Sequence, residues 1–159
     1  SLAQSGQLSD RYFRALYDVL LSKDLHHTTK MHTIFLNLVF KSLKADINVN
    51  RLRALVKRLL QISLYGEPNF VCAVLFMVSK LMDATPALRH AVEAQEVHEN
   101  DNNTSVADAS DDEEDDTSST TGYNPFKREP MYANAHCSGF WELHCLLNHY
   151  HASVGNFTE

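Results

Sequence analysis

Side chains that could bind a metal gather near the end of the chain. Cys and His are the usual ligands of structural zinc, and Cys145 and His149, four residues apart, would share one helix face. A zinc site usually needs a second short pair such as C-x2-C, and the segment lacks one. We therefore predict no metal site and interpret these residues as helix-packing cysteines and interfacial histidines. The candidate ligands, all within sixteen positions, are His136, Cys137, Cys145, His149 and His151.

The same segment contains a possible cysteine nucleophile. Cys137 precedes Ser138-Gly139 and has histidines nearby, but no glycine-rich turn or pattern typical of an oxyanion hole accompanies it. The sequence contains neither GxGxxG nor GxxxxGK[ST], so nothing supports a nucleotide cofactor. We predict no catalytic residue and no cofactor.

Basic side chains form a second candidate site, on two adjacent predicted helices. Lys and Arg placed near phosphate give affinity for nucleic acid without reading its sequence. The solvated face of an amphipathic helix would explain Lys57 and Arg58 about as well as RNA binding does. We keep both interpretations open. The candidate residues for nucleic-acid contact are Lys41, Lys44, Arg51, Arg53, Lys57 and Arg58.

The net charge of -6 hides a division of the chain into a basic body and an acidic belt. Residues 1–92 carry twelve Lys/Arg against six Asp/Glu, whereas residues 93–121 carry eleven Asp/Glu and no Lys/Arg. Residues 95–122 contain almost no large apolar side chains, so burial cannot offset the entropy lost on ordering. We predict a disordered acidic insert over 95–122 between a helical-repeat body, 1–94, and a segment, 123–159, that completes the same domain.

Helical periodicity dominates the body and predicts an all-α fold. Apolar residues recur at spacings of three and four, and short connections favour stacked antiparallel helices. These lengths suit an armadillo/HEAT-like helical solenoid fragment, while the absence of a clean internal repeat leaves a generic helical bundle open. One stripe, for example, would place Met31, Ile34, Phe35, Leu38, Val39 and Leu43 in the core. The predicted helices cover residues 9–24, 28–46, 48–66, 69–85 and 86–94.

After the insert, Pro125 and Pro130 forbid a helix, so we expect an extended segment over 123–132. A helix should follow from about Ser138 to His149. The first residue is Ser1 rather than Met, so the chain is interpreted as part of a longer protein. We find no secretion signal and no apolar run of membrane-spanning length, and three scattered cysteines indicate reduced thiols.

The C-terminal segment resembles the signature of the CCAAT-binding-factor (CBF) domain family of nucleolar ribosome-assembly proteins. The resemblance extends to the preceding helices and so covers most of the chain. Ala152 departs from the family pattern, which usually has proline there. The matching elements occur in order as Tyr123-Asn124-Pro125, Arg128-Glu129-Pro130, Asn134-Ala135, Trp141-Glu142-Leu143 and His149-Tyr150-His151.

This resemblance implies a solenoid-like scaffold without enzymatic activity. It implies work in the nucleus and nucleolus on the pre-60S ribosomal particle, with pre-rRNA and a second nucleolar complex protein as partners. It implies neither a small-molecule substrate nor a membrane. Within the motif, we expect Asn134 to cap or turn the chain, Trp141 to fill a groove between earlier helices, and Arg128 to pair with Glu142.

Two other functions stay open. A DNA-associated, CCAAT-type transcriptional regulator would bind duplex DNA in a sequence-specific way, but no recognition helix or basic zipper is visible. A protein-interaction module would make no nucleic-acid contact at all.

Overall fold

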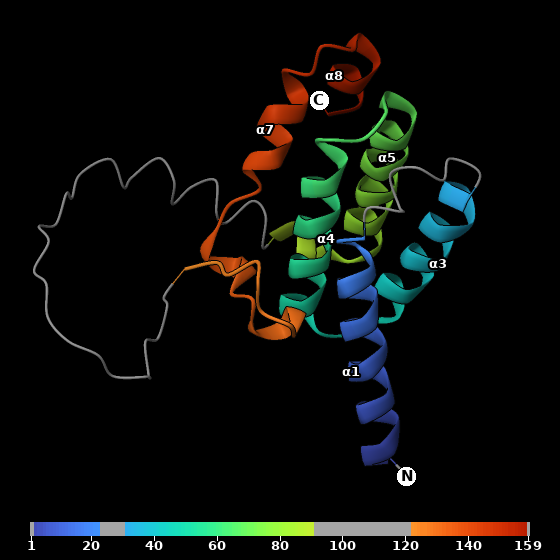
Figure 1. Cartoon of the computed structure of the whole chain (residues 1–159), viewed down its shortest axis with the longest axis vertical. Helices are drawn as coiled ribbons and strands as arrows, with labels where there is room; N and C mark the ends of the chain where they lie inside the picture. The colour runs from blue at the N-terminus through green and yellow to red at the C-terminus, as the bar shows by residue number, and fades with distance from the viewer. Residues whose placement is uncertain (1, 23–30, 91–121, 159) are drawn as a thin grey trace, which may run out of the picture.

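The computed structural model describes residues 2–22, 31–90 and 122–158, and these parts of the chain contain helices, turns and no strand (Figure 1). The all-α prediction is therefore confirmed, whereas the solenoid form stays a prediction. The predicted insert, apart from Gly122, and the first three residues of the helix predicted over 28–46 lie outside the described residues. Within those ranges, none of the helices combines the length and apolarity needed to cross a membrane.

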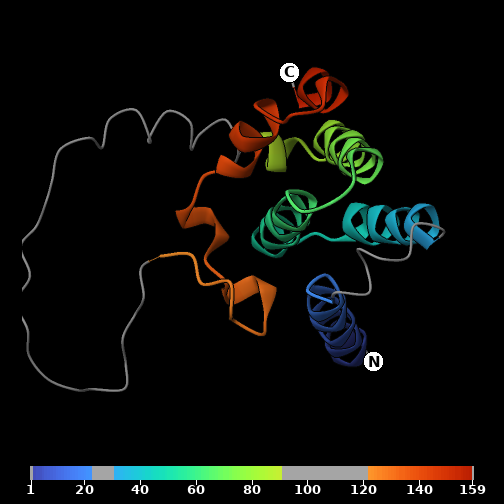
Figure 2. The ribbon, with the colours of Figure 1, turned by 45° about the horizontal axis from the view of Figure 1, so that its top comes forward.

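Four long helices form the body: α1 (Leu2–Val19), α3 (His32–Ala45), α4 (Val49–Ser63) and α5 (Pro68–Ala84). Helix α4 lies at the centre, with α3 on one side and the C-terminal residues on the other (Figure 2). Helix α5 packs against both α3 and α4. A short helical stretch, 86–90, follows.

Local sequence signals explain where α4 and α5 begin. Asn48 caps α4, because its side-chain oxygen accepts a hydrogen bond from the Arg51 amide at 3.2 Å. Pro68 opens α5 at a position where its missing N–H costs nothing. Gly66 makes the connection tight: a Cβ there would lie 2.8 Å from a Phe70 ring carbon. The predicted bounds of these two helices agree with the structure to within a few residues.

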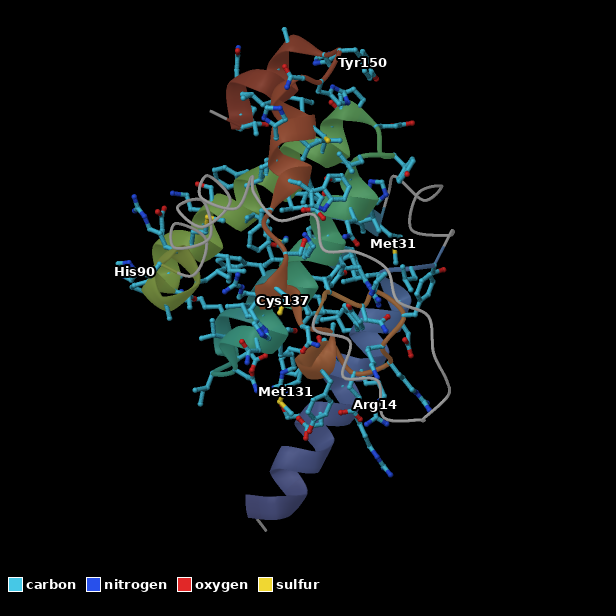
Figure 3. The ribbon with its side chains drawn as sticks, turned by 90° about the vertical axis from the view of Figure 1, so that its left-hand side faces the viewer. Arg14, Met31, His90, Met131, Cys137 and Tyr150 are labelled. Carbon is cyan, nitrogen blue, oxygen red and sulfur yellow. The ribbon has the colours of Figure 1, made fainter. Side chains whose placement is uncertain are left out.

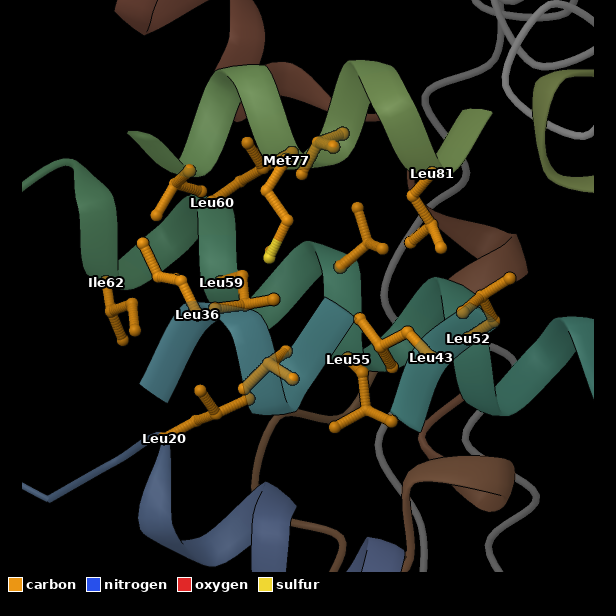
Figure 4. Packing of buried hydrophobic residues seen from close by; sticks show 14 of the residues in the cluster. Leu20, Leu36, Leu43, Leu52, Leu55, Leu59, Leu60, Ile62, Met77 and Leu81 are labelled. Atoms are coloured by element: carbon orange, nitrogen blue, oxygen red, sulfur yellow. The ribbon is translucent and has the colours of Figure 1, made fainter. Parts of the chain in front are cut away.

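The core is built around α4, which buries Leu52, Leu55, Leu59 and Leu60 almost completely (Figure 4). Leu43 of α3 joins this cluster. Burying an aliphatic side chain of this size stabilises the fold by about 1.5–3 kcal/mol. A Leu-rich α4 surrounded by other elements is therefore the main apolar contribution to the fold.

The predicted stripe of α3 is partly wrong. Met31, Ile34 and Leu38 are exposed by 56%, 66% and 52%, whereas Leu36 is buried with Val39 and Leu43. Helix α3 turns Leu36 towards α5 and leaves the other apolar edge uncovered. A helix with apolar residues on more than one side does not reveal by its sequence alone which side will be covered.

The beginning of α1 also differs from the prediction. The helix starts at Leu2 rather than at Ser9 or Asp10. The helix continues through Asp10, whose carboxylate accepts a hydrogen bond from Arg51 Nη1 at 2.6 Å, across 41 residues.

The C-terminal residues 122–158, hereafter the tail, contain two 3-10 turns and two short helices. Residues 123–132 are not extended: the Asn124 amide donates to the Ala133 carbonyl at 2.9 Å and closes a loop. The predicted helix 138–149 is shorter than expected, and a second one, starting at Ala152, was not predicted. The tail elements are η2 (Pro130–Tyr132), η3 (Ala135–Cys137), α7 (Trp141–Leu147) and α8 (Ala152–Thr158).

Candidate functional site at the interface between α4 and the tail

A fully buried ion pair joins α4 to the tail. The Nζ atom of Lys57 lies 3.1 Å from Oε1 of Glu142 on α7, and both side chains have an exposed fraction of 0%. Lys57 also donates to the Gly139 carbonyl at 2.6 Å. A buried charge of either sign is costly unless it is paired and hydrogen-bonded, and here both conditions hold.

Polar and aromatic neighbours complete the surroundings of this pair. Gln61 Nε2, one turn after Lys57, donates to Glu142 Oε1 at 2.9 Å. The Lys57 ammonium also lies 5.2, 5.7 and 5.8 Å from the ring centres of Tyr123, Phe140 and Trp141. These distances are within the range of cation–π attraction. Aromatic residues of the tail thus surround a cation that α4 supplies.

Arg58 makes a second fastening between α1, α4 and the tail. Its Nη1 donates to the Tyr17 carbonyl at 2.7 Å and its Nη2 to the Pro125 carbonyl at 2.5 Å. Arg58 is 2% exposed, and its burial lowers the pKa of its guanidinium. Tyr123 lies nearby, and its own burial raises the pKa of its hydroxyl. The planar guanidinium suits this bridging role because its donors point in fixed directions.

The remaining predicted basic residues divide into two groups. Arg53 is 7% exposed, and Arg51 bonds Asp46 through Nε at 2.7 Å and Nη2 at 2.6 Å. Only Lys41 and Lys44 remain exposed on α3. The six residues therefore do not share one solvated face, and the interpretation of Lys57 and Arg58 as solvated is wrong. Lys57 pairs with Glu142 and a carbonyl, and Arg58 with two carbonyls, all of them from distant parts of the sequence.

The tail motif residues divide between the interface and the surface. Pro130, Ala135 and Glu142 are buried, Ala135 directly against α4, while Pro125 and Arg128 are exposed. The expected pair between Arg128 and Glu142 is replaced by Lys57–Glu142, and Glu129 pairs instead with Arg14 of α1. The structure places six motif residues against α4, by contact or hydrogen bond: Tyr123, Pro125, Pro130, Ala135, Trp141 and Glu142.

Trp141 does not fill a groove as expected. It is 48% exposed at the start of α7, and Leu146, which is fully buried, supplies the apolar anchor of that helix. Asn134 does turn the chain, with φ 52° and ψ 39° in the left-handed region, but its side chain makes no cap hydrogen bond. Asn tolerates this region better than most residues because its short polar side chain can bond locally.

The predicted Cys and His residues do not converge. Cys137 and Cys145 are exposed, and His149 Nδ1 accepts a hydrogen bond from the His151 amide at 3.1 Å. Among residues 2–22, 31–90 and 122–158, no three His, Cys, Asp or Glu side chains are arranged to hold a metal ion. Figure 3 shows the face where the tail covers the body, with Cys137, Met131 and Arg14 along it.

Sequence reasoning missed several members of this interface. Gln61, Gly139 and the Tyr17 carbonyl were not singled out, and nothing in their spacing announces a partner. One signal was present: Lys57 in "ALVKRLL" and Glu142 in "FWEL" each lie in a largely apolar stretch, where an unpaired charge is unfavourable once the stretch is buried. Two oppositely charged residues in such apolar stretches are candidates for a buried ion pair.

Residues 1–158, which include every residue of this interface, match the CBF/Mak21 family. The chain belongs to this family. The family predicted from the tail motif is therefore confirmed. In this CBF/Mak21 chain, the Trp-Glu-Leu element of the motif holds the tail on α4, because Glu142 is the buried partner of Lys57.

Relatives of this CBF/Mak21 chain include ribosome biogenesis protein NOC1 of Chaetomium thermophilum, 40% identical over 170 residues. CCAAT/enhancer-binding protein zeta of Mus musculus is 32% identical over 195 residues. The matches cover 99% and 96% of this chain but only 16% and 18% of those proteins. Nucleolar complex protein 1 of Drosophila melanogaster is 35% identical over 82 residues, which cover 51% of this chain and 7% of that protein.

The basic region around "KSLKAD" and "ALVKRLL" also predicts, within the family, a special likeness to CCAAT/enhancer-binding protein zeta and its fungal counterpart, the first nucleolar complex protein. Both are among these relatives. This CBF/Mak21 chain spans less than a fifth of their length.

Proposed function

We propose that this chain is a non-catalytic helical part of a scaffold protein that acts in the nucleolus during assembly of the large (60S) ribosomal subunit. The observation that carries the proposal is the match of nearly the whole chain, at 40% identity, to a protein named for ribosome biogenesis. A second relative, covering about half of the chain, is named as a nucleolar complex protein.

The chemistry of the interface is consistent with a structural role. Lys57 and Glu142 are both inaccessible to solvent, and their polar atoms are engaged with Gly139 and Gln61. A general acid or base has to reach a substrate, whereas these two groups contact only other groups of the protein interior. Their arrangement fixes the tail on α4 and thereby holds the outer surface of the domain in one shape.

The partners proposed are the pre-60S particle with its pre-rRNA and a second nucleolar complex protein. Lys41 and Lys44 are exposed on α3 and can approach phosphate. Arg53, Lys57 and Arg58 are excluded from this role while the tail is docked, since each is at most 7% exposed.

Crosslinking in cells followed by sequencing of the bound nucleic acid tests the proposal. We expect large-subunit pre-rRNA, with less of it when Lys41 and Lys44 are both replaced by Glu. Lys80→Glu is the matched control, because Lys80 is an exposed lysine on a different helix, paired with Asp83 at 3.3 Å. Recovery of pre-rRNA that is equal for all variants would remove Lys41 and Lys44 from the proposal.

The second candidate is a DNA-associated, CCAAT-type regulator, favoured by the name of the mouse relative, CCAAT/enhancer-binding protein zeta. The same crosslinking experiment separates it: promoter DNA without rRNA would replace the scaffold proposal. A crosslinked protein partner with neither nucleic acid would favour the third candidate, a protein-interaction module.

A further inference from the structure

A loop of the tail presents an aromatic ring to solvent. Phe126 is 93% exposed, the highest value among the Phe and Trp side chains that the structure describes as exposed. Phenylalanine is among the residues most often buried, so an almost fully exposed ring is informative. The neighbours of Phe126 in the loop, Pro125 and Lys127, are exposed as well.

The backbone beneath Phe126 is held from within the molecule. Asn124 Oδ1 accepts a hydrogen bond from the Phe126 amide at 2.9 Å, and the Asn124 amide donates to the Ala133 carbonyl at 2.9 Å. The buried Arg58 donates to the Pro125 carbonyl. These bonds aim the ring outward without any packing of the ring itself, so the exposed position is preorganised.

Within residues 123–128, the charged side chains next to the ring are positive. Lys127 and Arg128 are both exposed, and neither forms an ion pair within the described parts of the chain. The only carboxylate in this stretch, Glu129, is paired with Arg14 of α1. The loop tip thus combines one accessible aromatic face with two accessible cations.

We infer that this loop tip, residues 125–128, is a binding site for single-stranded RNA. A base would stack on Phe126 while Lys127 and Arg128 contact the flanking phosphates, which is the general chemistry of single-strand binding. A protein partner fits less well on one count: Lys127 is of a type that is depleted in protein interfaces, although Phe and Arg are enriched in them. The inference rests on the proposed RNA contact and adds a second location for it, separate from Lys41 and Lys44 on α3.

Fluorescence anisotropy with a labelled, mixed-sequence single-stranded RNA of about 12 nucleotides, a length within the usual site sizes, tests the inference on the full chain. Phe126→Ala should weaken binding roughly 5- to 150-fold, the effect of losing one base–aromatic stack. Phe126→Trp should retain binding. Replacing Lys127 and Arg128 by Gln should reduce the slope of log K against log salt concentration by about 1.4 in magnitude, because two phosphate contacts are lost.

Tyr65→Ala is the matched control, since Tyr65 is 86% exposed on the connection between α4 and α5. It should leave the affinity unchanged, and circular dichroism should show the same helix content for all variants. Equal losses for Tyr65→Ala and Phe126→Ala would overturn the site, as would wild-type affinity in Phe126→Ala.

The experiments distinguish a failure of the loop inference from a failure of the proposed function. If the wild-type chain does not bind the RNA, the loop inference is overturned, while crosslinking to the pre-60S particle through proteins would still support the scaffold. If Phe126→Ala keeps RNA affinity but loses a co-purifying protein, the loop is a protein site and the inference is also overturned.

Discussion

Replacing Lys57 by Met should destabilise the domain by about 3–5 kcal/mol, the usual cost of leaving one member of a buried ion pair without its partner. Glu142 would remain 0% exposed and keep only the Gln61 amide at 2.9 Å, while the Gly139 carbonyl would lose its donor at 2.6 Å. Because domains of this size are stable by only about 5–15 kcal/mol, the variant should lose a large part of its free energy of unfolding.

Urea unfolding followed by two probes measures this effect. Circular dichroism reports the helices of the body, and fluorescence of Trp141, the only tryptophan in the chain, reports the start of α7. In Lys57→Met we expect the fluorescence transition to move to lower urea concentration at least as far as the dichroism transition. Lys41→Met, an exposed lysine on α3, is the matched control and should change stability by no more than about 0.5 kcal/mol.

The double variant Lys57→Met/Glu142→Leu separates charge from packing. It removes both buried charges together, so it should recover most of the stability that Lys57→Met loses. A loss below about 1 kcal/mol in Lys57→Met would refute the reasoning that the pair is buried and charged. A double variant as unstable as the sum of the single variants would show that lost packing, rather than an unpaired charge, causes the effect.

Three further predictions concern the tail and its neighbours. In urea unfolding, Trp141→Ala should lower the free energy of unfolding by about 1–2 kcal/mol and Leu146→Ala by about 2–5 kcal/mol. The reason is that Trp141 is half exposed whereas Leu146 is fully buried, and the reverse order would contradict this burial. Asn134→Ala should destabilise by about 1 kcal/mol and Asn134→Gly should not, since φ is 52°; equal effects would exclude backbone strain. Burial raises the pKa of Tyr17, so the folded state keeps its proton longer and stability should fall as pH rises above about 10. Tyr17→Phe should flatten this fall, and an unchanged pH profile would count against the burial.

The helices of the body could be predicted because their signals are local. Asn48 as a cap, and Gly66 and Pro68 between two apolar runs, fix α4 and α5 within a few residues. The apolar edge of α3 that is buried could not be predicted in the same way. Ile34 and Leu36 are equally apolar, and only the packing of the other helices decides that Leu36 is covered.

The interface could be predicted only in part. The motif indicated that Tyr123, Pro130 and Glu142 belong to a docked segment, and the structure places them near α4 or buried in the fold. The identity of the Glu142 partner was wrong, because a basic residue on an amphipathic helix looks solvated until a carboxylate from 85 residues away is placed on it. Trp141 was overestimated as an anchor for a similar reason: size alone does not place a side chain inside.

The long separation between the two halves of the ion pair has a consequence for biosynthesis. At the usual pace of translation, about 5–20 residues per second, some 4–17 s pass between the synthesis of Lys57 and that of Glu142, which lie 85 positions apart. Through that interval α4 carries Lys57 and Arg58 before any tail exists to cover them. The nascent body therefore has a cationic, partly apolar surface that stays uncovered until the tail residues have been synthesised and can dock on α4.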